Sequence, residues 1–242
     1  MHVEVYETFA QVVQVAADKV EDLVRRDGEL TLGLATGSTP ELLYAELTRR
    51  VRGGLDLSGL RITSLDEYIG LPADDLHSYH HYIQERVIGP WGIDPTRVRL
   101  PDGSRADCHT AAMEFAAELA HGGVDLQLLG IGANGHIGFN EPGSALDSGT
   151  RVVELTDSTR HANARFFDSE DQVPRRAITQ GLGTICQAKQ IMLLASGPTK
   201  APAVHDLVHG PVTAQLPASV LHRHPHASVL LDQQAAGTLP QS

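Results

Sequence analysis

Short, mostly apolar runs recur along the chain, separated by longer segments in which apolar and polar residues alternate with a helical period. Continuous apolar runs of this length are typical of strands buried on both faces of a parallel sheet. The predicted strands are residues 30–34, 61–64, 124–129, 191–194 and 228–231. The sequence therefore indicates a sheet whose strands are mostly parallel.

The segments between these strands have the apolar spacing of amphipathic helices, and each is long enough to cross over a sheet and cover its face. The predicted helices are residues 9–25, 40–51, 106–120 and 200–208. Alternating strands and helices predict a layered α/β fold. A chain of 242 residues is expected to form a single domain, residues 1–242, and only the last residues, 237–242, have the composition of a loose tail.

Charge and cysteine content narrow the class of protein. The formal net charge is −11, which disfavours binding to nucleic acid or to an acidic membrane surface, so an anionic substrate must meet a local basic pocket. Only Cys108 and Cys186 are present, far apart in sequence, which favours a reducing compartment such as the cytoplasm. Residues 1–9 lack the pattern of a signal peptide, and no apolar stretch is long enough to span a membrane.

Ligands of parallel sheets collect at the carboxyl ends of the strands, so the residues that follow each predicted strand carry the candidate chemistry. After residues 30–34 the chain reads A-T-G-S-T-P. Here Gly37 permits an unusual backbone turn, while Ser38 and Thr39 can offer hydroxyl and N–H groups to a phosphate at a helix N-terminus. The alternative is a helix cap in which Ser38 or Thr39 satisfies the first backbone amides.

The strand at residues 61–64 leads directly to Asp66, Glu67 and Tyr68. An aspartate at this edge of the sheet could remove a proton from a sugar carbon, provided that water is excluded and the neighbouring carbonyl is polarised. The alternative is that Asp66 caps the next segment and that Glu67 is solvated.

The segment after residues 124–129 reads G-I-G-A-N-G-H-I-G-F-N-E-P-G. Gly130, Gly132 and Gly135 fit a dinucleotide-binding fingerprint, and Glu154 lies at about the distance of its ribose-binding acid. That motif needs a continuous helix after the third glycine. Helix-breaking residues interrupt the stretch instead, namely Gly138, Pro142, Gly143 and Gly149. The glycines are better explained by a wide loop.

This loop carries the best candidate for a proton shuttle. The imidazole of His136 can take a hydroxyl proton from a cyclic sugar and return it to the ring oxygen, with Glu141 orienting the ring. A single histidine beside a glycine-rich loop is more often structural, but with Asn134, Asn140 and Glu141 nearby the structural and catalytic interpretations are equally open.

Residues 195–200, A-S-G-P-T-K, follow the strand at 191–194 and place Lys200 in the first turn of the next helix. A lysine there opposes the helix dipole, a cost that a bound phosphate would reverse. Arg165, predicted on a helix over residues 158–167, is a candidate second cation. The alternative for both is a solvated surface side chain.

Two groups of histidines are candidate metal ligands: His77, His80 and His81, and His222, His224 and His226. Pro225 interrupts the second group, and no carboxylate or thiolate lies close to it in sequence. We therefore expect loop or pocket-rim residues and no metal.

Taken together, the motifs resemble those of the glucosamine-6-phosphate deaminase family. They are L-A-T-G-S-T-P, S-L-D-E-Y-I-G-L-P, G-I-G-A-N-G-H-I-G-F-N-E-P-G and A-S-G-P-T-K, with S-T-R-H-A-N-A-R-F-F-D from residue 158 and Q-V-P-R-R-A-I-T-Q-G-L-G-T-I from residue 172. The resemblance covers almost the whole chain. It implies a modified Rossmann-like sheet with helices on both faces and no cofactor.

The resemblance also implies a reaction and a role for each matching residue. The substrate would be glucosamine 6-phosphate, converted with water to fructose 6-phosphate and ammonium. Asp66 would be the enolisation base, and His136, supported by Glu141, would open the sugar ring. The phosphate site implied by the resemblance consists of Gly37, Ser38, Thr39, Arg165 and Lys200. We expect a monomer or a small homo-oligomer.

Two departures from the family pattern qualify this interpretation. Asn134 stands where the best-known members have an aspartate, and an asparagine can orient His136 but cannot favour its protonated form by charge. The chain also lacks the longer C-terminal segment of the allosteric members, so we expect no activator site. A lactonase, a deaminase for the galactosamine epimer and a non-enzymatic sugar sensor remain alternatives. The acid and base groups together argue against the sensor.

Overall fold

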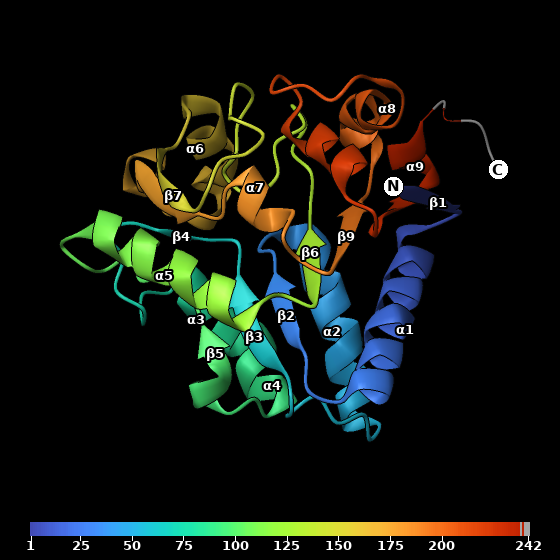
Figure 1. The fold of residues 1–242 in the computed structure, drawn as a ribbon, viewed down its shortest axis with the longest axis horizontal. Helices are drawn as coiled ribbons and strands as arrows, with labels where there is room; N and C mark the ends of the chain where they lie inside the picture. Colours follow the sequence, from blue (N-terminus) through green and yellow to red (C-terminus); the bar gives the residue numbers. More distant parts are fainter. Residues whose placement is uncertain (238, 240–242) are drawn as a thin grey trace.

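A seven-stranded parallel sheet forms the centre of the protein in the computed structural model, which describes residues 1–237 and 239 (Figure 1). The strand order is β1-β10-β9-β6-β2-β3-β5. The strands are β1 (His2–Tyr6), β2 (Thr31–Leu34), β3 (Arg61–Ser64), β5 (Val98–Arg99), β6 (Leu126–Leu129), β9 (Gln190–Ala195) and β10 (Ala227–Asp232). Most of the predicted tail, residues 238 and 240–242, lies outside the described residues.

All five predicted strands are confirmed, and the two that the sequence analysis missed are the edge strands β1 and β5. Edge strands are covered on fewer sides, so their sequences need not be continuously apolar. Accordingly, β1 reads HVEVY with mostly half-buried residues, and β5 has only two residues, too few to show a period.

Helices cover both faces of the sheet, as predicted. One core cluster joins the sheet to α1 (Phe9–Asp27), α2 (Ser38–Arg52), α3 (Tyr79–Ile83) and α4 (Gly89–Trp91). The cluster on the opposite face involves α5 (Cys108–Gly122), α7 (Leu182–Ile185), α8 (Ala201–His209) and α9 (Gln233–Ala236). Strand residues alternate between the two, since Leu128 packs in the first cluster and Leu129 in the second. None of the described helices is both long enough and apolar enough to cross a membrane.

The remaining helical pieces are short. They are α6 (Asp157–Asn163), a π-helical turn (Gln84–Ile88) and the 3₁₀ turns Pro95–Arg97, Ala164–Phe166, Glu170–Gln172, Pro198–Lys200 and Pro217–Arg223. The single helix predicted over residues 158–167 is therefore α6 followed by the 3₁₀ turn that carries Arg165. Lys200 ends a 3₁₀ turn immediately before α8 rather than lying inside that helix.

A second, three-stranded antiparallel sheet, in the order β4-β8-β7, was not predicted. It consists of β4 (Asp66–Tyr68), β8 (Arg176–Thr179) and β7 (Arg151–Glu154). Only Leu65 separates β3 from β4, so the chain leaves the main sheet and enters the second one at Asp66. Figure 1 shows this small sheet beside the carboxyl ends of the central strands, with α6 next to it. The resulting corner positions the candidate site.

Candidate active site

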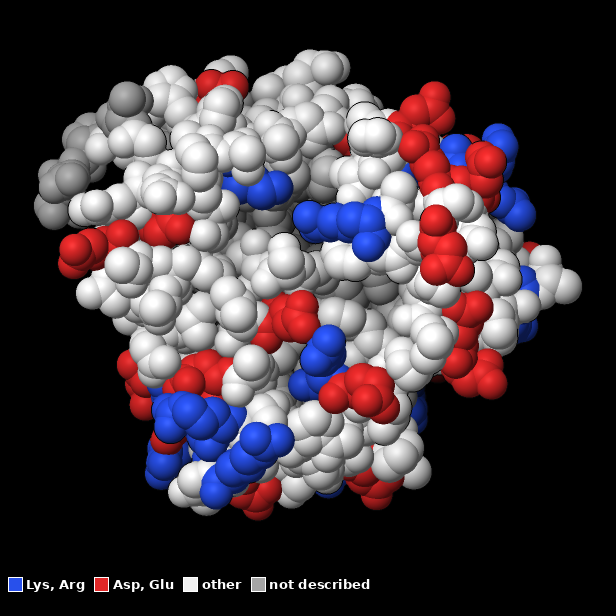
Figure 2. Space-filling model, turned by 180° about the vertical axis from the view of Figure 1, so that it is seen from behind, with Lys and Arg blue, Asp and Glu red and all other residues white. Residues whose placement is uncertain are grey.

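A cavity of about 630 Å³ opens at the carboxyl ends of β2, β3 and β6. Eight of the nine predicted site residues line it: Gly37, Ser38, Thr39, Asp66, Asn134, His136, Arg165 and Lys200. The ninth, Glu141, lies behind His136 and contacts it. Figure 2 shows the molecule from behind, with basic side chains at the edge of a hollow on this face. The structure thus brings together side chains that are far apart in sequence.

Asp66 forms part of the cavity wall and is only 5% exposed. No hydrogen bond from a described residue reaches its carboxyl group. The backbone passes close by at Gly138, where an added Cβ would lie 3.4 Å from Asp66 Oδ2. Burial, and then the negative charge of Glu67, raise the pKa of Asp66 to about 8. A carboxyl group in this state is a stronger base than an exposed one once it is ionised.

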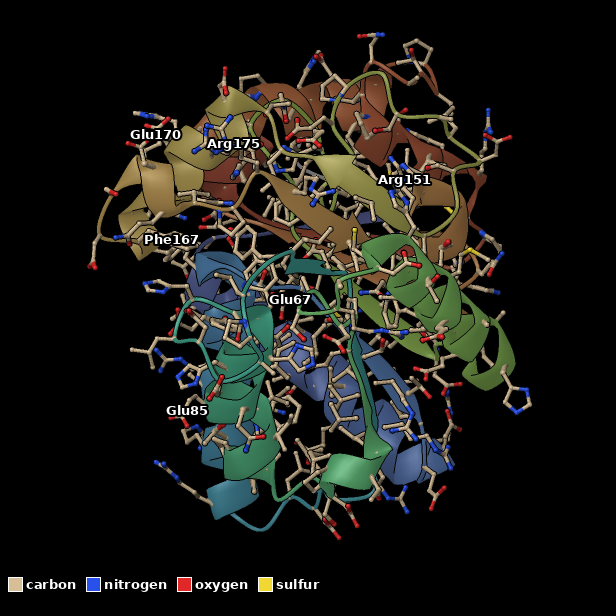
Figure 3. The ribbon with its side chains drawn as sticks, turned by 90° about the vertical axis from the view of Figure 1, so that its left-hand side faces the viewer. Glu67, Glu85, Arg151, Phe167, Glu170 and Arg175 are labelled. Atoms are coloured by element: carbon tan, nitrogen blue, oxygen red, sulfur yellow. The ribbon has the colours of Figure 1, made fainter. Side chains whose placement is uncertain are left out.

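Glu67 is the second acid of this corner, and the suggestion that it is solvated is wrong, because it is 2% exposed. Its carboxylate accepts hydrogen bonds from the backbone N–H groups of Tyr68, Tyr79 and His80, at 2.7, 3.0 and 2.8 Å. The His80 Nδ1 atom lies 2.9 Å from Glu67 Oε2. Figure 3 shows Glu67 in the interior of the molecule, close to α3. Glu67 therefore ties β4 to the start of α3 and keeps a negative charge beside Asp66.

Aromatic residues beside Asp66 form part of the cavity wall, and no role for them was predicted from the sequence. The Tyr68 ring lies 4.7 Å from Tyr79 and 5.8 Å from Phe139, measured between centroids. The Tyr68 hydroxyl accepts a hydrogen bond from Asn163 Nδ2 of α6 at 2.9 Å. The tyrosines of D-E-Y and S-Y-H-H-Y were the available signal, but tyrosines also pack in ordinary cores. Their position at the site depends on the second sheet.

His136 projects into the cavity from the loop after β6, and a glycine makes room for it. A Cβ on Gly132 would lie 2.4 Å from the His136 ring, so no larger residue fits there without moving the imidazole. His136 Nδ1 lies 3.4 Å from Glu141 Oε2, an ion-pair distance. The approach does not meet hydrogen-bond geometry, so this buried nitrogen has no hydrogen-bond partner among the described residues. In the structure without substrate, His136 and Glu141 therefore interact as an ion pair without a hydrogen bond.

Glu141 is held as an anion by several donors. Asn134 Nδ2 donates to Glu141 Oε2 at 2.8 Å, and the Thr159 hydroxyl of α6 donates to Glu141 Oε1. Burial alone would raise the pKa of Glu141, but the contacts with His136, Thr159 and Asn134 outweigh it and lower the pKa to about 2. Thr159 was not identified from the sequence, because its contact joins segments 18 residues apart.

The predicted phosphate-binding residues Gly37, Ser38 and Thr39 lie at the N-terminus of α2, where they line the cavity. This helix begins at Ser38, two residues before the predicted start, and its N-cap is Gly37 with φ of 109° and no side-chain cap. The capping alternative for Ser38 and Thr39 is therefore wrong. The Tyr82 hydroxyl donates to the Gly37 carbonyl at 3.2 Å, which holds the turn from outside. The N–H groups at the start of α2 remain available to an anion.

Lys200 and Arg165 supply positive charge at the same cavity. Burial, and then the nearby Arg165, lower the pKa of Lys200. In the part of the chain that the structure describes, neither side chain forms a salt bridge, and the Arg165 guanidinium lies 4.7 Å from the centre of the Phe166 ring. Two neighbouring cations without counter-ions, facing a cavity in a protein of net charge −11, are the arrangement expected for a bound anion.

Within the described residues, the dinucleotide-like glycines and the histidine groups do not form separate sites. After Gly135 no helix begins before α6 at Asp157 within the described residues, so the dinucleotide fingerprint lacks its helix, as predicted. Across residues 1–237 and 239, no group of three or more His, Cys, Asp or Glu side chains could hold a metal ion. His77 does line the cavity. His224 instead is buried and bonds through Nε2 to the Ala188 carbonyl at 2.8 Å.

Comparison with known proteins adds evidence independent of this geometry. Residues 5–230 match the model of a family described as glucosamine-6-phosphate isomerases/6-phosphogluconolactonase. The chain is 50% identical over 227 residues to a glucosamine-6-phosphate deaminase of Pseudarthrobacter chlorophenolicus, covering 93% of this chain and 88% of the relative. It is 49% identical over 229 residues to a glucosamine-6-phosphate deaminase of Streptomyces coelicolor, covering 93% and 88%.

Solved structures agree with these sequence matches. A monomeric glucosamine-6-phosphate deaminase superimposes with a TM-score of 0.94 at 42% identity, covering 98% of this chain and 99% of that one. A 6-phosphogluconolactonase from Trypanosoma brucei superimposes with a TM-score of 0.76 at 24% identity, which shows a shared fold alone.

Proposed function

This chain belongs to the family of glucosamine-6-phosphate isomerases and 6-phosphogluconolactonases, and we propose that it is a glucosamine-6-phosphate deaminase of amino sugar catabolism. The reaction is the conversion of glucosamine 6-phosphate and water to fructose 6-phosphate and ammonium. The observation that carries this proposal is the single cavity shared by Asp66, His136 and the cations Lys200 and Arg165. We treat residues 1–242 as one catalytic domain.

The phosphate of the substrate fixes its position in this proposal. It sits against the start of α2, at Gly37, Ser38 and Thr39, and is neutralised by Lys200 and Arg165. Binding energy from this unreacting group can be used to hold the reacting carbon atoms against the catalytic side chains. Lys200 regains the charge partner that it lacks in the unliganded cavity.

Ring opening is assigned to His136 and Glu141. The imidazole takes the proton of the anomeric hydroxyl and returns a proton to the ring oxygen, which breaks the C1–O5 bond and leaves an aldehyde. Glu141 stabilises the positive charge that His136 carries during this exchange. Asn134 supports Glu141 by donating to it. An aspartate at this position would instead place a second carboxylate 2.8 Å from the first.

Enolisation is assigned to Asp66. The aldehyde acidifies the neighbouring C–H, so that Asp66 can remove the C2 proton and deliver it to C1. The product is an imine at C2, to which water adds as ammonia leaves, giving the ketose. A substrate ammonium group close to Asp66 favours the ionised carboxylate, which offsets the effect of burial on its pKa. In this proposal, side chains move protons while the C1–O5 bond opens, water adds at C2 and the C2–N bond breaks, and no cofactor takes part.

We also propose a cytoplasmic location and a monomer or small homo-oligomer, supported by the free thiols of Cys108 and Cys186 and by the monomeric structural neighbour. No role in binding nucleic acid or membranes is proposed.

The test is a coupled assay of ammonia and fructose 6-phosphate with purified protein in the presence of EDTA. Wild-type protein should release both products from glucosamine 6-phosphate, and the substrate panel should include galactosamine 6-phosphate and 6-phosphogluconolactone. Asp66→Asn should lower kcat by about 10²- to 10⁴-fold, the usual contribution of one acid or base group, with little change in substrate binding. Asp22→Asn, on the exposed side of α1, is the matched control. Lactone hydrolysis without ammonia release would overturn the proposal.

A further inference from the structure

Glu141 is held from two different parts of the chain. Asn134 contacts it from the same loop, whereas Thr159 contacts it from α6. Thr159 is 6% exposed and lines the cavity. Its hydroxyl donates to the carboxylate Oε1 atom, and a hydrogen bond to an ionised acceptor is stronger than one between neutral groups. This contact joins α6, which lines the cavity, to the loop that carries His136.

The helix that carries Thr159 also contacts β4, the strand that begins with Asp66, and leads into Arg165. Asn163, one turn further along, donates to the Tyr68 hydroxyl on the strand that begins with Asp66. Residues four apart lie on the same face of a helix, so both contacts are made by one face of α6. Arg165 follows directly on the 3₁₀ turn after α6. One short segment therefore contacts Glu141, contacts the strand that begins with Asp66, and continues into Arg165.

The Thr159 hydroxyl is not needed to form the helix itself. The N-cap of α6 is Thr156, whose side chain accepts a hydrogen bond from Thr159 N at 3.2 Å. Threonine hydroxyls inside helices commonly bond to a backbone carbonyl of the preceding turn. Here the hydroxyl donates to a carboxylate on a separate loop, so it links α6 to the loop that carries Glu141.

We propose that Thr159 is a positioning residue for ring opening, which fixes the Glu141 carboxylate relative to His136 from the segment that binds the phosphate. This inference rests on the proposed function and adds a residue that neither the motifs nor the family match assigns. When Thr159 is in place, both Glu141 oxygens have donors and the carboxylate cannot rotate away from the imidazole. Because α6 leads into Arg165, binding of the phosphate also steadies the acid–base pair at the opposite end of the sugar.

The test compares Thr159→Val, which keeps the shape but removes the hydroxyl, with Thr159→Ser, which keeps the hydroxyl. Thr159→Val should lower kcat for glucosamine 6-phosphate by about 10- to 100-fold, as small misplacements of catalytic groups do. Thr159→Ser should stay within about threefold of wild type. The affinity for the reduced open-chain analogue, 2-amino-2-deoxyglucitol 6-phosphate, should change by less than about threefold in both variants, because this ligand needs no ring opening.

The chain offers a closely matched control in Thr110. It occupies the same third position of α5, and its hydroxyl donates to the Asp107 carboxylate at 2.7 Å, away from the cavity. Thr110→Val should leave kcat unchanged, and Thr159→Ala should reproduce the effect of Thr159→Val. Thermal unfolding of each variant checks that it is folded.

Unchanged kcat in Thr159→Val would overturn the inference, as would a Thr159→Ser variant as slow as Thr159→Val. Loss of analogue binding in parallel with kcat would also overturn it, because the residue would then act on binding. Failure of the proposed function is seen separately, as absence of ammonia release by the wild-type protein.

Discussion

Asp66 shows at the scale of one residue how function and stability oppose each other. Its carboxyl group is buried beside a second buried acid, Glu67, and the pKa of Asp66 is raised from 3.8 to about 8. The folded protein therefore resists ionisation of a group that the proposed mechanism uses in its ionised form. A buried carboxylate without donors is costly to the fold, and the proposed mechanism gives this one a use as a base.

This conflict predicts a stabilising substitution. Because the pKa of Asp66 is higher in the folded than in the unfolded chain, its contribution to stability is full below pH 4 and is lost as the pH rises to about 8. Asp66→Asn removes that loss, so its stability advantage over wild type should grow from pH 5 to pH 8, reaching a few kcal/mol at about 1.4 kcal/mol for each pKa unit.

Urea unfolding at pH 5 and pH 8 measures the difference between wild type and Asp66→Asn directly. The exposed Asp22→Asn variant should show no such growth with pH. An Asp66→Asn variant no more stable than wild type at pH 8 would show that the carboxyl group is not destabilised by its surroundings.

The role of a single residue could be predicted from the sequence where that residue follows a predicted strand and belongs to a short continuous motif. Asp66, His136 and Lys200 were identified in this way, and all three line the cavity. Thr159 was given no role, and the suggestion that Glu67 is solvated was wrong, because the contacts of both residues depend on partners in other segments. Asn134 was identified as unusual, but its donation to Glu141 follows only from the loop geometry.

At the scale of elements, the buried parallel strands were predictable, because burial on both faces leaves a continuous apolar signal. The second sheet was not, since β4 contains the polar sequence Asp-Glu-Tyr and is only three residues long. The strand β4 is stabilised by pairing with β8 and by the N–H groups that donate to Glu67. Both are interactions between segments far apart in sequence. The corner at Asp66 therefore depends on tertiary context.

The loop after β6 leads to a prediction at this scale. Gly132→Ala should lower kcat by about 100-fold, because the new methyl group needs the space of the His136 ring and displaces the imidazole. Gly149→Ala, in the same connection between β6 and β7, is the control, because nothing lies within 4 Å of its added Cβ and its φ is not positive. Equal activity of the two variants would show that His136 does not need its present position.

At the scale of the whole molecule, a net charge of −11 repels an anionic substrate. The cavity has a locally positive charge, because Lys200 and Arg165 line it. Lys200→Met should raise KM for glucosamine 6-phosphate by about 10- to 100-fold, the loss expected for one charge-assisted contact with phosphate. Lys189→Met is the control, since Lys189 is exposed and paired with Asp125 at 2.7 Å. A larger effect of Lys189 than of Lys200 would contradict the assigned phosphate site.

The central claim is that one cavity holds the phosphate at one end and presents C2 and the ring oxygen to Asp66 and His136 at the other. A crystal structure with 2-amino-2-deoxyglucitol 6-phosphate tests it most directly. The phosphate should contact Lys200, Arg165 and the start of α2, with C2 beside the Asp66 carboxylate and O5 within hydrogen-bond reach of His136, about 3 Å. An analogue bound with its phosphate elsewhere, or with C2 turned away from Asp66, would contradict the account.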